Sequence, residues 1–169
     1  MENHSCYRKA GCYYNSAFCF RNHYIVYDGD LQKGVSWPTP RFTDNGDGTV
    51  TDELTELMWT EDANLPVGTK TWQEALDYVA ELNKSAYLDY NDWRLPNRKE
   101  LHSLTDFSQF SPALQSPNPF TNVQATYYWS STNCIPCTDF AWAVSMLSGR
   151  VGTGEMTSDT YVWPVRGGQ

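Results

Sequence analysis

The chain has 169 residues and a formal net charge of −8, which arises from twelve Lys and Arg residues and twenty Asp and Glu residues. The basic residues are scattered, which argues against nucleic acid as a partner because binding to phosphates needs clustered Lys and Arg. No apolar run approaches the roughly 20 residues that a membrane helix needs, so we expect no insertion into a membrane.

The composition predicts one domain that is rich in strands and loops. Seven Trp, eleven Tyr and seven Phe supply an aromatic core, and charged residues make up only 19% of the chain. A chain of this length can bury roughly 70% of its unfolded surface. The first 30 residues lack the apolar centre of a secretory signal. We interpret residues 1–40 as an arm that packs on a main domain of residues 41–169, with a short strand expected at 24–27.

The first half of the main domain contains a predicted hairpin, a strand and a helix. Residues 41–52 form the hairpin, with Gly, Asn and Asp in its turn at residues 45–48. Residues 56–60 form the strand. The helix spans residues 71–83, where Thr71 begins a capping box and apolar residues recur at the 3.6 period.

The stretch Trp93-Arg94-Leu95-Pro96 predicts a corner followed by a second helix. Proline moves the residue before it out of helical geometry. Asn97 then provides an N-cap, and Glu100 stands where its side chain can reach back to the cap. We expect this helix to end near Thr105 and to be followed by a long irregular connection over residues 105–126.

The last part of the chain predicts a run of strands. The candidates are residues 127–131, 140–147, 150–154 and 161–166, and Pro164 places the last strand at an edge or a bulge. The alternation in 140–147 predicts two distinct faces. The whole pattern indicates an α+β domain in which two helices pack on a small, mostly antiparallel sheet with long irregular loops.

Five cysteines leave several interpretations open. Cys6, Cys12 and Cys19 lie in the arm, and Cys134 and Cys137 form a Cys-x-x-Cys pair. We favour a disulfide within the N-terminal group. Free buried thiols come second, and a zinc site that uses the Cys-x-x-Cys pair and two early cysteines comes third. A thioredoxin-like role is not favoured because no βαβ pattern surrounds the pair.

Five ordered stretches carry a resemblance to a known family. They are residues 41–52, Leu57-Met58-Trp59-Thr60, Trp93-Arg94-Leu95-Pro96-Asn97-Arg98-Lys99-Glu100-Leu101, Tyr128-Trp129-Ser130-Ser131-Thr132 and Val162-Trp163-Pro164-Val165-Arg166-Gly167-Gly168. Together they resemble the Lcl C-terminal domain family, which is named for a collagen-like bacterial surface protein. The resemblance covers the chain from about Asp28 onward. It implies a C-type-lectin-like fold in which the two ends of the chain meet in one sheet.

No constellation in the sequence favours catalysis. His4, His23 and His102 are isolated, no carboxylate pair suggests acid–base chemistry, and no Gly-rich loop opens a helix. Formylglycine-generating enzymes share the implied fold and use a reactive cysteine pair, but the residues around Cys134 and Cys137 do not match that family's site. We expect no enzyme, no cofactor and no metal site.

The resemblance extends to the variable proteins of diversity-generating retroelements, in which mutagenesis at template adenines randomises codons near the 3′ end of the gene. Asn codons that end in C can then become many residues, but not Trp, Met, Gln, Glu or Lys. Residues 133–141 contain none of those five. We therefore expect a ligand-binding face within 127–165. Its candidate contacts are Asn133, Ile135, Thr138, Asp139, Phe140, Ala143, Ser145, Leu147, Ser148, Arg150, Thr153, Thr157, Ser158 and Asp159.

Charged and aromatic residues inside the motifs have structural interpretations. We interpret Arg94 and Arg166 as buried charges that pair with a carboxylate or with strand carbonyls, and contact with a ligand is the alternative. We assign five tryptophans to the core, namely Trp59, Trp72, Trp93, Trp129 and Trp142.

The leading functional hypothesis is a non-enzymatic protein that binds a receptor or other ligand through a variable surface on a C-type-lectin-like scaffold. The partner is then a protein or a glycan on another surface, and the protein acts on an extracellular surface or a virion. The first alternative is an adhesin or lectin of fixed specificity for acidic polysaccharides, against which the charge of −8 argues. The second is a formylglycine-generating-type oxidase.

Overall fold

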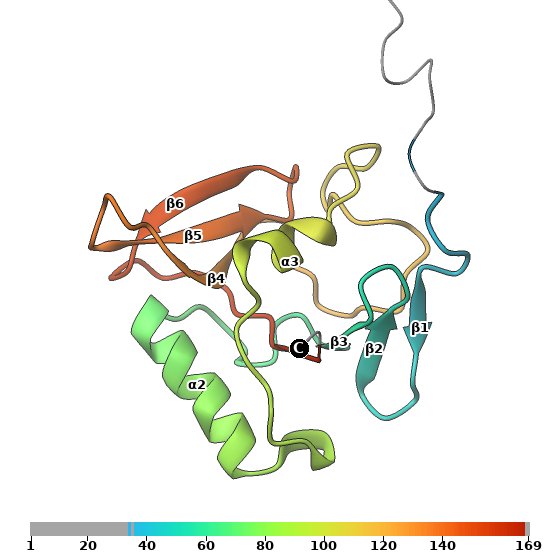
Figure 1. Cartoon of the computed structure of the whole chain (residues 1–169), viewed down its shortest axis with the longest axis horizontal. Helices are drawn as coiled ribbons and strands as arrows, with labels where there is room; N and C mark the ends of the chain where they lie inside the picture. Colours follow the sequence, from blue (N-terminus) through green and yellow to red (C-terminus); the bar gives the residue numbers. More distant parts are fainter. Residues whose placement is uncertain (1–33, 35, 168–169) are drawn as a thin grey trace, which may run out of the picture. The chain divides into compact units, whose positions relative to one another are not determined.

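The computed structural model describes residue 34 and residues 36–167, and the chain divides into two units, 1–36 and 37–169. Every helix and strand below belongs to the second unit. The strand expected at 24–27 and most of the expected arm lie outside the described residues. The elements in chain order (Figure 1) are β1 (Phe42–Asp44), β2 (Thr49–Asp52), β3 (Leu57–Thr60), α2 (Trp72–Lys84), the 3-10 helix η1 (Tyr87–Asp89), α3 (Arg98–Ser103), β4 (Tyr127–Asn133), β5 (Phe140–Ser145), β6 (Val151–Glu155) and β7 (Val165–Arg166).

A four-stranded antiparallel sheet joins the early and late parts of the unit, in the order β1-β2-β3-β7. β1 and β2 form the expected hairpin. Asp44 and Asp47 each accept a hydrogen bond from the backbone N–H two residues ahead, at 2.8 and 3.0 Å, which stabilises the turn expected at residues 45–48. β3 pairs with β7, so that Trp59 lies opposite Val165. The last strand and the first strands of this unit therefore meet in one sheet, which agrees with the meeting of chain ends that the resemblance implied.

The last strand is shorter than predicted, because β7 contains only Val165 and Arg166. The residues before it change partners between the two sheets. Tyr161 forms a parallel bridge with Tyr128 of β4, and its carbonyl accepts a hydrogen bond from the next residue of that strand. Pro164 has no N–H to give to a ladder, and its carbonyl accepts a hydrogen bond from Thr60 at 3.2 Å.

The other strands form a second antiparallel sheet, in the order β4-β5-β6. A bulge interrupts β4 between Trp129 and Asn133. The α+β class predicted from the sequence is confirmed, with one refinement. The strands form two small sheets instead of one. The segment 161–164 passes from one sheet to the other, since Tyr161 hydrogen-bonds with β4 and the Pro164 carbonyl accepts a hydrogen bond from Thr60 of β3.

Both predicted helices are present with their caps. Thr71 and Glu74 make a capping box at the start of α2, and Asn97 and Glu100 make another at the start of α3. The Asn97 side chain accepts hydrogen bonds from two backbone N–H groups of the first turn at 2.9 and 3.0 Å. These bonds satisfy donors that a helix start otherwise leaves unpaired.

The core consists of two clusters on opposite faces of the β4-β5-β6 sheet. One cluster lies against α2 and contains Ala75, Val79, Trp129 and Ala141. The other lies toward α3 and the four-stranded sheet, and its large side chains include Trp59, Leu101, Leu104, Tyr128, Val144, Met146 and Trp163. Trp59, Trp93 and Trp129 are buried, as predicted, whereas Trp72 and Trp142 are only half-buried.

The connection over 105–126 is irregular, as predicted, and it is held by backbone hydrogen bonds. Asp106 bonds to Ala113, Ala113 bonds to Met146 just after β5, and Thr121 bonds to Glu61 after β3. The loop therefore spans the two sheets. None of the described residues forms a helix long and apolar enough to cross a membrane.

Candidate functional site

The two faces of β5 are unequal, and this decides which predicted residues a ligand can reach. Ala141 and Ala143 pair across the strands with Gly154 and Gly152 of β6. The Trp129 ring fills the space beside them, since a Cβ added at Gly154 would lie 2.9 Å from that ring. These residues form the inner face, which packs against α2.

Two of the predicted contact residues lie on this inner face and are removed from the candidate surface. Ala143 is 3% exposed, and Ser145 is 4% exposed. The Ser145 hydroxyl accepts a hydrogen bond from the Leu147 N–H at 3.2 Å, which helps to form the turn after β5. The alternating pattern of residues 140–147 correctly predicted two distinct faces. The prediction that Ala143 and Ser145 contact the ligand was wrong, because their side chains lie on a buried face.

The other face of β5 is buried at Val144, but nearer the start of the strand it carries a partly exposed aromatic pair, Phe140 and Trp142. The guanidinium of Arg98, at the start of α3, lies over the Trp142 ring at 4.4 Å from its centroid. The Arg98 N–H donates to Thr132 Oγ1 at 3.0 Å, so α3 is fixed to β4 beside this ring. Sequence analysis missed Trp142 as a surface residue, although alternating glycines at 152 and 154 are a signal that the opposite face is crowded.

The loop from β4 to β5 contains a disulfide that the sequence did not predict. Cys134 and Cys137 are joined. The Cys134 N–H donates to the Phe140 carbonyl at 2.8 Å, and the Phe140 N–H donates to the Cys137 carbonyl at 3.0 Å. The pair therefore has no free thiolates to offer a metal ion, and the zinc interpretation is wrong. The favoured N-terminal disulfide concerns cysteines outside the described residues.

Most of the predicted contacts gather at one end of the three-stranded sheet, to the left in Figure 1. The β4–β5 loop and the loop after β6 meet there, and the Met156 N–H donates to the Asp139 carbonyl at 2.8 Å. Phe140 is half-buried. The exposed candidates at this end are Asn133, Ile135, Thr138, Asp139, Thr157, Ser158 and Asp159.

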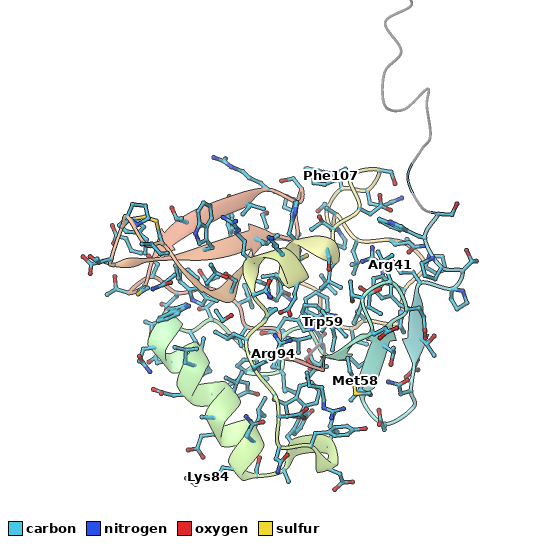
Figure 2. All side chains as sticks on the ribbon, viewed as in Figure 1. Arg41, Met58, Trp59, Lys84, Arg94 and Phe107 are labelled. Carbon is cyan, nitrogen blue, oxygen red and sulfur yellow. A yellow bond between two sulfur atoms is a disulfide. The ribbon has the colours of Figure 1, made fainter. Side chains whose placement is uncertain are left out.

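The remaining predicted contacts do not join this group. Thr153 is exposed in the middle of β6, while Leu147, Ser148 and Arg150 surround the β5–β6 turn at the opposite end of the sheet. There the 105–126 connection adds Phe107, which Figure 2 shows at the edge of the molecule. Phe107 is 71% exposed, and a Cβ at Gly149 would come within 2.8 Å of its ring.

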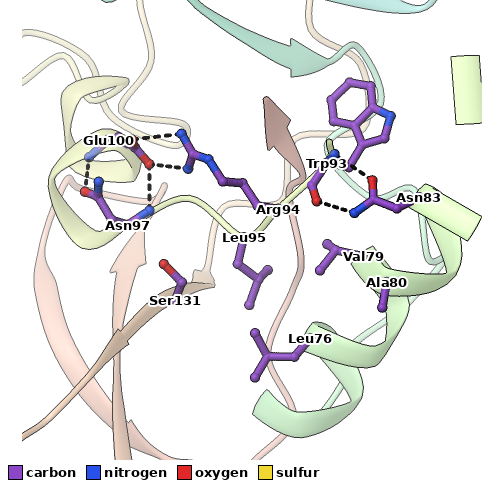
Figure 3. Close-up of a pocket in the computed structure, with 10 residues that line it drawn as sticks. All are labelled: Leu76, Val79, Ala80, Asn83, Trp93, Arg94, Leu95, Asn97, Glu100 and Ser131. Atoms are coloured by element: carbon purple, nitrogen blue, oxygen red, sulfur yellow. Dashed lines mark hydrogen bonds and ion pairs between the residues drawn. The ribbon is translucent and has the colours of Figure 1, made fainter. Parts of the chain in front are cut away.

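A separate hollow of about 510 Å³ lies between α2 and the segment 93–97 (Figure 3). Leu76, Val79 and Leu95 line it, together with Arg94 and Glu100. The Arg94 guanidinium donates to both oxygens of Glu100 at 2.7 and 3.0 Å and also to the Gly167 carbonyl at 2.9 Å. Because this charge is already paired, the hollow offers no free cation to an acidic ligand.

Arg166 is also paired, so the pairing expected for both arginines is confirmed, whereas the full burial expected for them is not. It donates to both oxygens of Asp92 at 2.7 and 3.2 Å, and its guanidinium lies 3.7 Å from the centroid of the Tyr90 ring. The hydrogen bonds from Arg166 lower the pKa of Asp92 below its usual value. The side chains of Arg94 and Arg166 remain 26% and 22% exposed.

A family model for the Lcl C-terminal domain matches residues 48–166, which is well over half of the chain. The chain belongs to this family. A search of curated proteins finds no match. The match runs from the β1–β2 turn into β7, so the Lcl C-terminal domain contains α2, α3, the three-stranded sheet and both groups of candidate residues.

The perturbed tyrosines of this Lcl C-terminal domain are structural groups. Burial raises the pKa of Tyr78 to about 12, and burial likewise raises the pKa of Tyr128. The Tyr128 hydroxyl also accepts a hydrogen bond from the Gln124 N–H at 2.8 Å. Both phenols therefore stay protonated near neutral pH. Among residues 34 and 36–167, no group of three or more His, Cys, Asp or Glu side chains is placed to hold a metal ion.

Proposed function

We propose that the protein is a non-enzymatic binding protein of the Lcl C-terminal domain family that presents a variable surface to a receptor or other ligand on a cell or a virion. The variable proteins of diversity-generating retroelements are the model for this role. The observation that carries the proposal is the exposure of the candidate residues. Eleven of the fourteen are exposed, Phe140 is half-buried, and Ala143 and Ser145 are buried.

The framework beneath this surface supports the proposal physically. The inner face of β4-β5-β6 is closed by Trp129 and α2, and the β4–β5 loop is braced by the Cys134–Cys137 disulfide. Substitutions at exposed positions away from caps and special turns usually change the free energy of unfolding by less than about 0.5 kcal/mol. Such a framework tolerates many different side chains on the loops and keeps their backbone in place.

The codon pattern gives the proposal a further prediction. Trp142, Glu155 and Met156 cannot arise from Asn codons that end in C, so they belong to the fixed framework if diversification works in that way. Asp139 and Phe140, which stand beside them, can arise from such codons. The proposed surface then combines fixed and variable side chains in one patch.

Sequencing of the DNA around the gene tests this proposal directly. The expected result is a near-copy of the 3′ end of the gene, beside a reverse transcriptase gene, that differs mainly where the copy has adenine. The differing codons should fall on the exposed candidates and not on Ala143 or Ser145. Absence of the repeat, or differences concentrated in core codons, would contradict the diversification proposal.

A second candidate function is a lectin of fixed specificity. Half-exposed Trp142 and 71% exposed Phe107 favour it, because the flat faces of aromatic rings can pack against sugars. A glycan array separates the two functions when it is combined with the DNA test. Saturable glycan binding that is lost in Trp142→Ala and Phe107→Ala, with no repeat near the gene, would favour the lectin.

A further inference from the structure

A pocket of about 380 Å³ lies where β5 begins and β6 ends, within the group of candidates at that end of the sheet. Its lining consists of Asp139, Phe140, Glu155, Met156 and Thr157. Two of these residues, Glu155 and Met156, are not among the predicted contacts. The pocket therefore joins the β4–β5 loop to the loop after β6.

The apolar part of the pocket comes from Phe140 and Met156, which are both half-buried. Phe140 stands directly opposite Glu155 in the β5–β6 ladder, so these two side chains lie on the same face of the sheet. The Met156 N–H donates to the Asp139 carbonyl at 2.8 Å, so these two residues lie next to the Phe140–Glu155 pair. Together they place an aromatic ring and a thioether beside two carboxylates.

The two carboxylates at this pocket have no cation among the described residues. Neither Asp139 nor Glu155 lies within 4.0 Å of a Lys, Arg or His nitrogen, and both are exposed. The Arg98 guanidinium lies over the Trp142 ring, and the Lys70 ammonium lies over the Tyr78 ring at 5.4 Å from its centroid. Arg150 belongs to the turn at the opposite end of the sheet. The pocket thus combines apolar walls with uncompensated negative charge.

We propose that this pocket takes the cationic side chain of a lysine or arginine on a protein partner. The long apolar stem of such a side chain fits against Phe140 and Met156 while its charged end reaches Asp139 and Glu155. A cation near the Phe140 ring gains further attraction from the ring face. The inference rests on the proposed function, because it names the chemical group that the proposed surface binds.

Nuclear magnetic resonance with small probes tests the inference on the full chain. The probes are N-acetyl-L-lysine methylamide and N-acetyl-L-arginine methylamide, and the control probe is N-acetyl-L-norleucine methylamide, which keeps the apolar stem without the charge. The cationic probes should shift the backbone amides of residues 139, 140 and 155–157 in a saturable way. The norleucine probe should bind at least about tenfold more weakly, because two exposed charge pairs together contribute about that factor.

Matched variants separate a local effect from a change in net charge. Asp139→Asn with Glu155→Gln should weaken binding of the cationic probes about tenfold. Glu53→Gln with Asp89→Asn removes two exposed carboxylates elsewhere and should leave binding unchanged. Amide spectra and thermal unfolding of both double variants show whether each remains folded.

Three outcomes would overturn the inference: equal binding of the norleucine probe, no saturable shift with either cation, or equal loss of binding in both double variants. These outcomes are distinct from failure of the proposed function. A missing repeat near the gene would remove diversification and leave cation binding measurable. Conversely, if the repeat is found while the cationic probes fail to bind, the proposal of a variable surface would stand. The proposal that this pocket binds lysine or arginine would then be wrong.

Discussion

Charged and aromatic side chains have opposite environments in two regions of the molecule. One region is the four-stranded sheet, and the other is the end of the three-stranded sheet where the β4–β5 loop meets the loop after β6, which we call the loop end. Around the four-stranded sheet, Arg41 and Asp52 form a fully buried ion pair, and Trp59 and Trp163 are inaccessible to solvent. At the loop end, the carboxylates have no cationic partner among the described residues, and Ile135 is 86% exposed. The charged and aromatic groups of the first region are enclosed by other parts of the domain, whereas those of the second remain available to another molecule.

The largest difference between the two regions should appear when an aromatic or aliphatic side chain is truncated. The Trp163 ring packs against Phe120 and Tyr128 at centroid distances of 4.8 and 5.5 Å, and its N–H donates to the Thr60 carbonyl at 3.0 Å. Trp163→Ala should therefore lower the free energy of unfolding by about 3–5 kcal/mol in urea titrations.

Ile135→Ala is the matched change at the loop end, and it should alter the same quantity by less than about 0.5 kcal/mol. Comparable losses in the two variants would mean that the loop end belongs to the stabilising core. That result would weaken the proposal that its side chains can vary.

A smaller effect should separate two glycines within β6. A Cβ at Gly154 would lie 2.9 Å from the Trp129 ring, whereas a Cβ at Gly152 would have an ordinary contact of 3.7 Å with Tyr127. Because Trp129 is buried and cannot move away easily, Gly154→Ala should destabilise the protein by about 1–3 kcal/mol. Gly152→Ala should be neutral or should stabilise by up to about 1 kcal/mol, since alanine restricts the unfolded chain.

Thermal or urea unfolding of these two variants locates the boundary between framework and surface on a single strand. If both variants lost the same free energy, the inner face would not be closed by Trp129 as described. The assignment of positions on β6 to the fixed framework or to the variable surface would then be wrong.

The smallest effect concerns pH and the pair formed by Asp92 and Arg166. Since Arg166 lowers the folded-state pKa of Asp92, the unfolded state binds a proton more readily. The stabilisation is present above the unfolded pKa and is lost as the pH falls toward the folded pKa. Asp92→Asn should cost at most about 1 kcal/mol at pH 7, because the pair is partly exposed.

At about pH 3 the difference between Asp92→Asn and the unaltered protein should shrink, as measured by urea unfolding at both pH values. Glu81→Gln provides a control, since it removes the partner of Lys84 in an exposed pair on α2. A pH-independent cost of Asp92→Asn would show that the asparagine disturbs packing and not the charge pair.

Local patterns predicted the elements well because each element has a local cause. The capping boxes at Thr71 and Asn97, the turn at residues 45–48 and the corner at Pro96 all depend on residues within a few positions of one another. The α+β class and the pairing of early and late strands also agreed with expectation, the latter through family resemblance.

Features that depend on distant contacts could not be predicted in the same way. The buried pair of Arg41 and Asp52 joins β2 to the residue before β1, and Arg41 also donates to the carbonyl of Ser103 in α3. Likewise, both faces of β5 carry buried residues, and which positions on each face are covered depends on where α2 and α3 pack. Ala143 was therefore assigned to the ligand and Trp142 to the core.

The pairing of β3 with β7 joins residues that are 108 positions apart, as the contact of Arg166 with Met58 shows. Because β7 is the last strand to be synthesised, this pairing affects when the domain can fold during translation. A chain that terminates anywhere within 133–159 lacks Trp163 and Val165, so β3 keeps an unpaired edge and Trp59 loses a large part of its cover. The domain therefore completes its fold only after the ribosome has passed the whole candidate surface, and truncated products are left as targets for proteolysis.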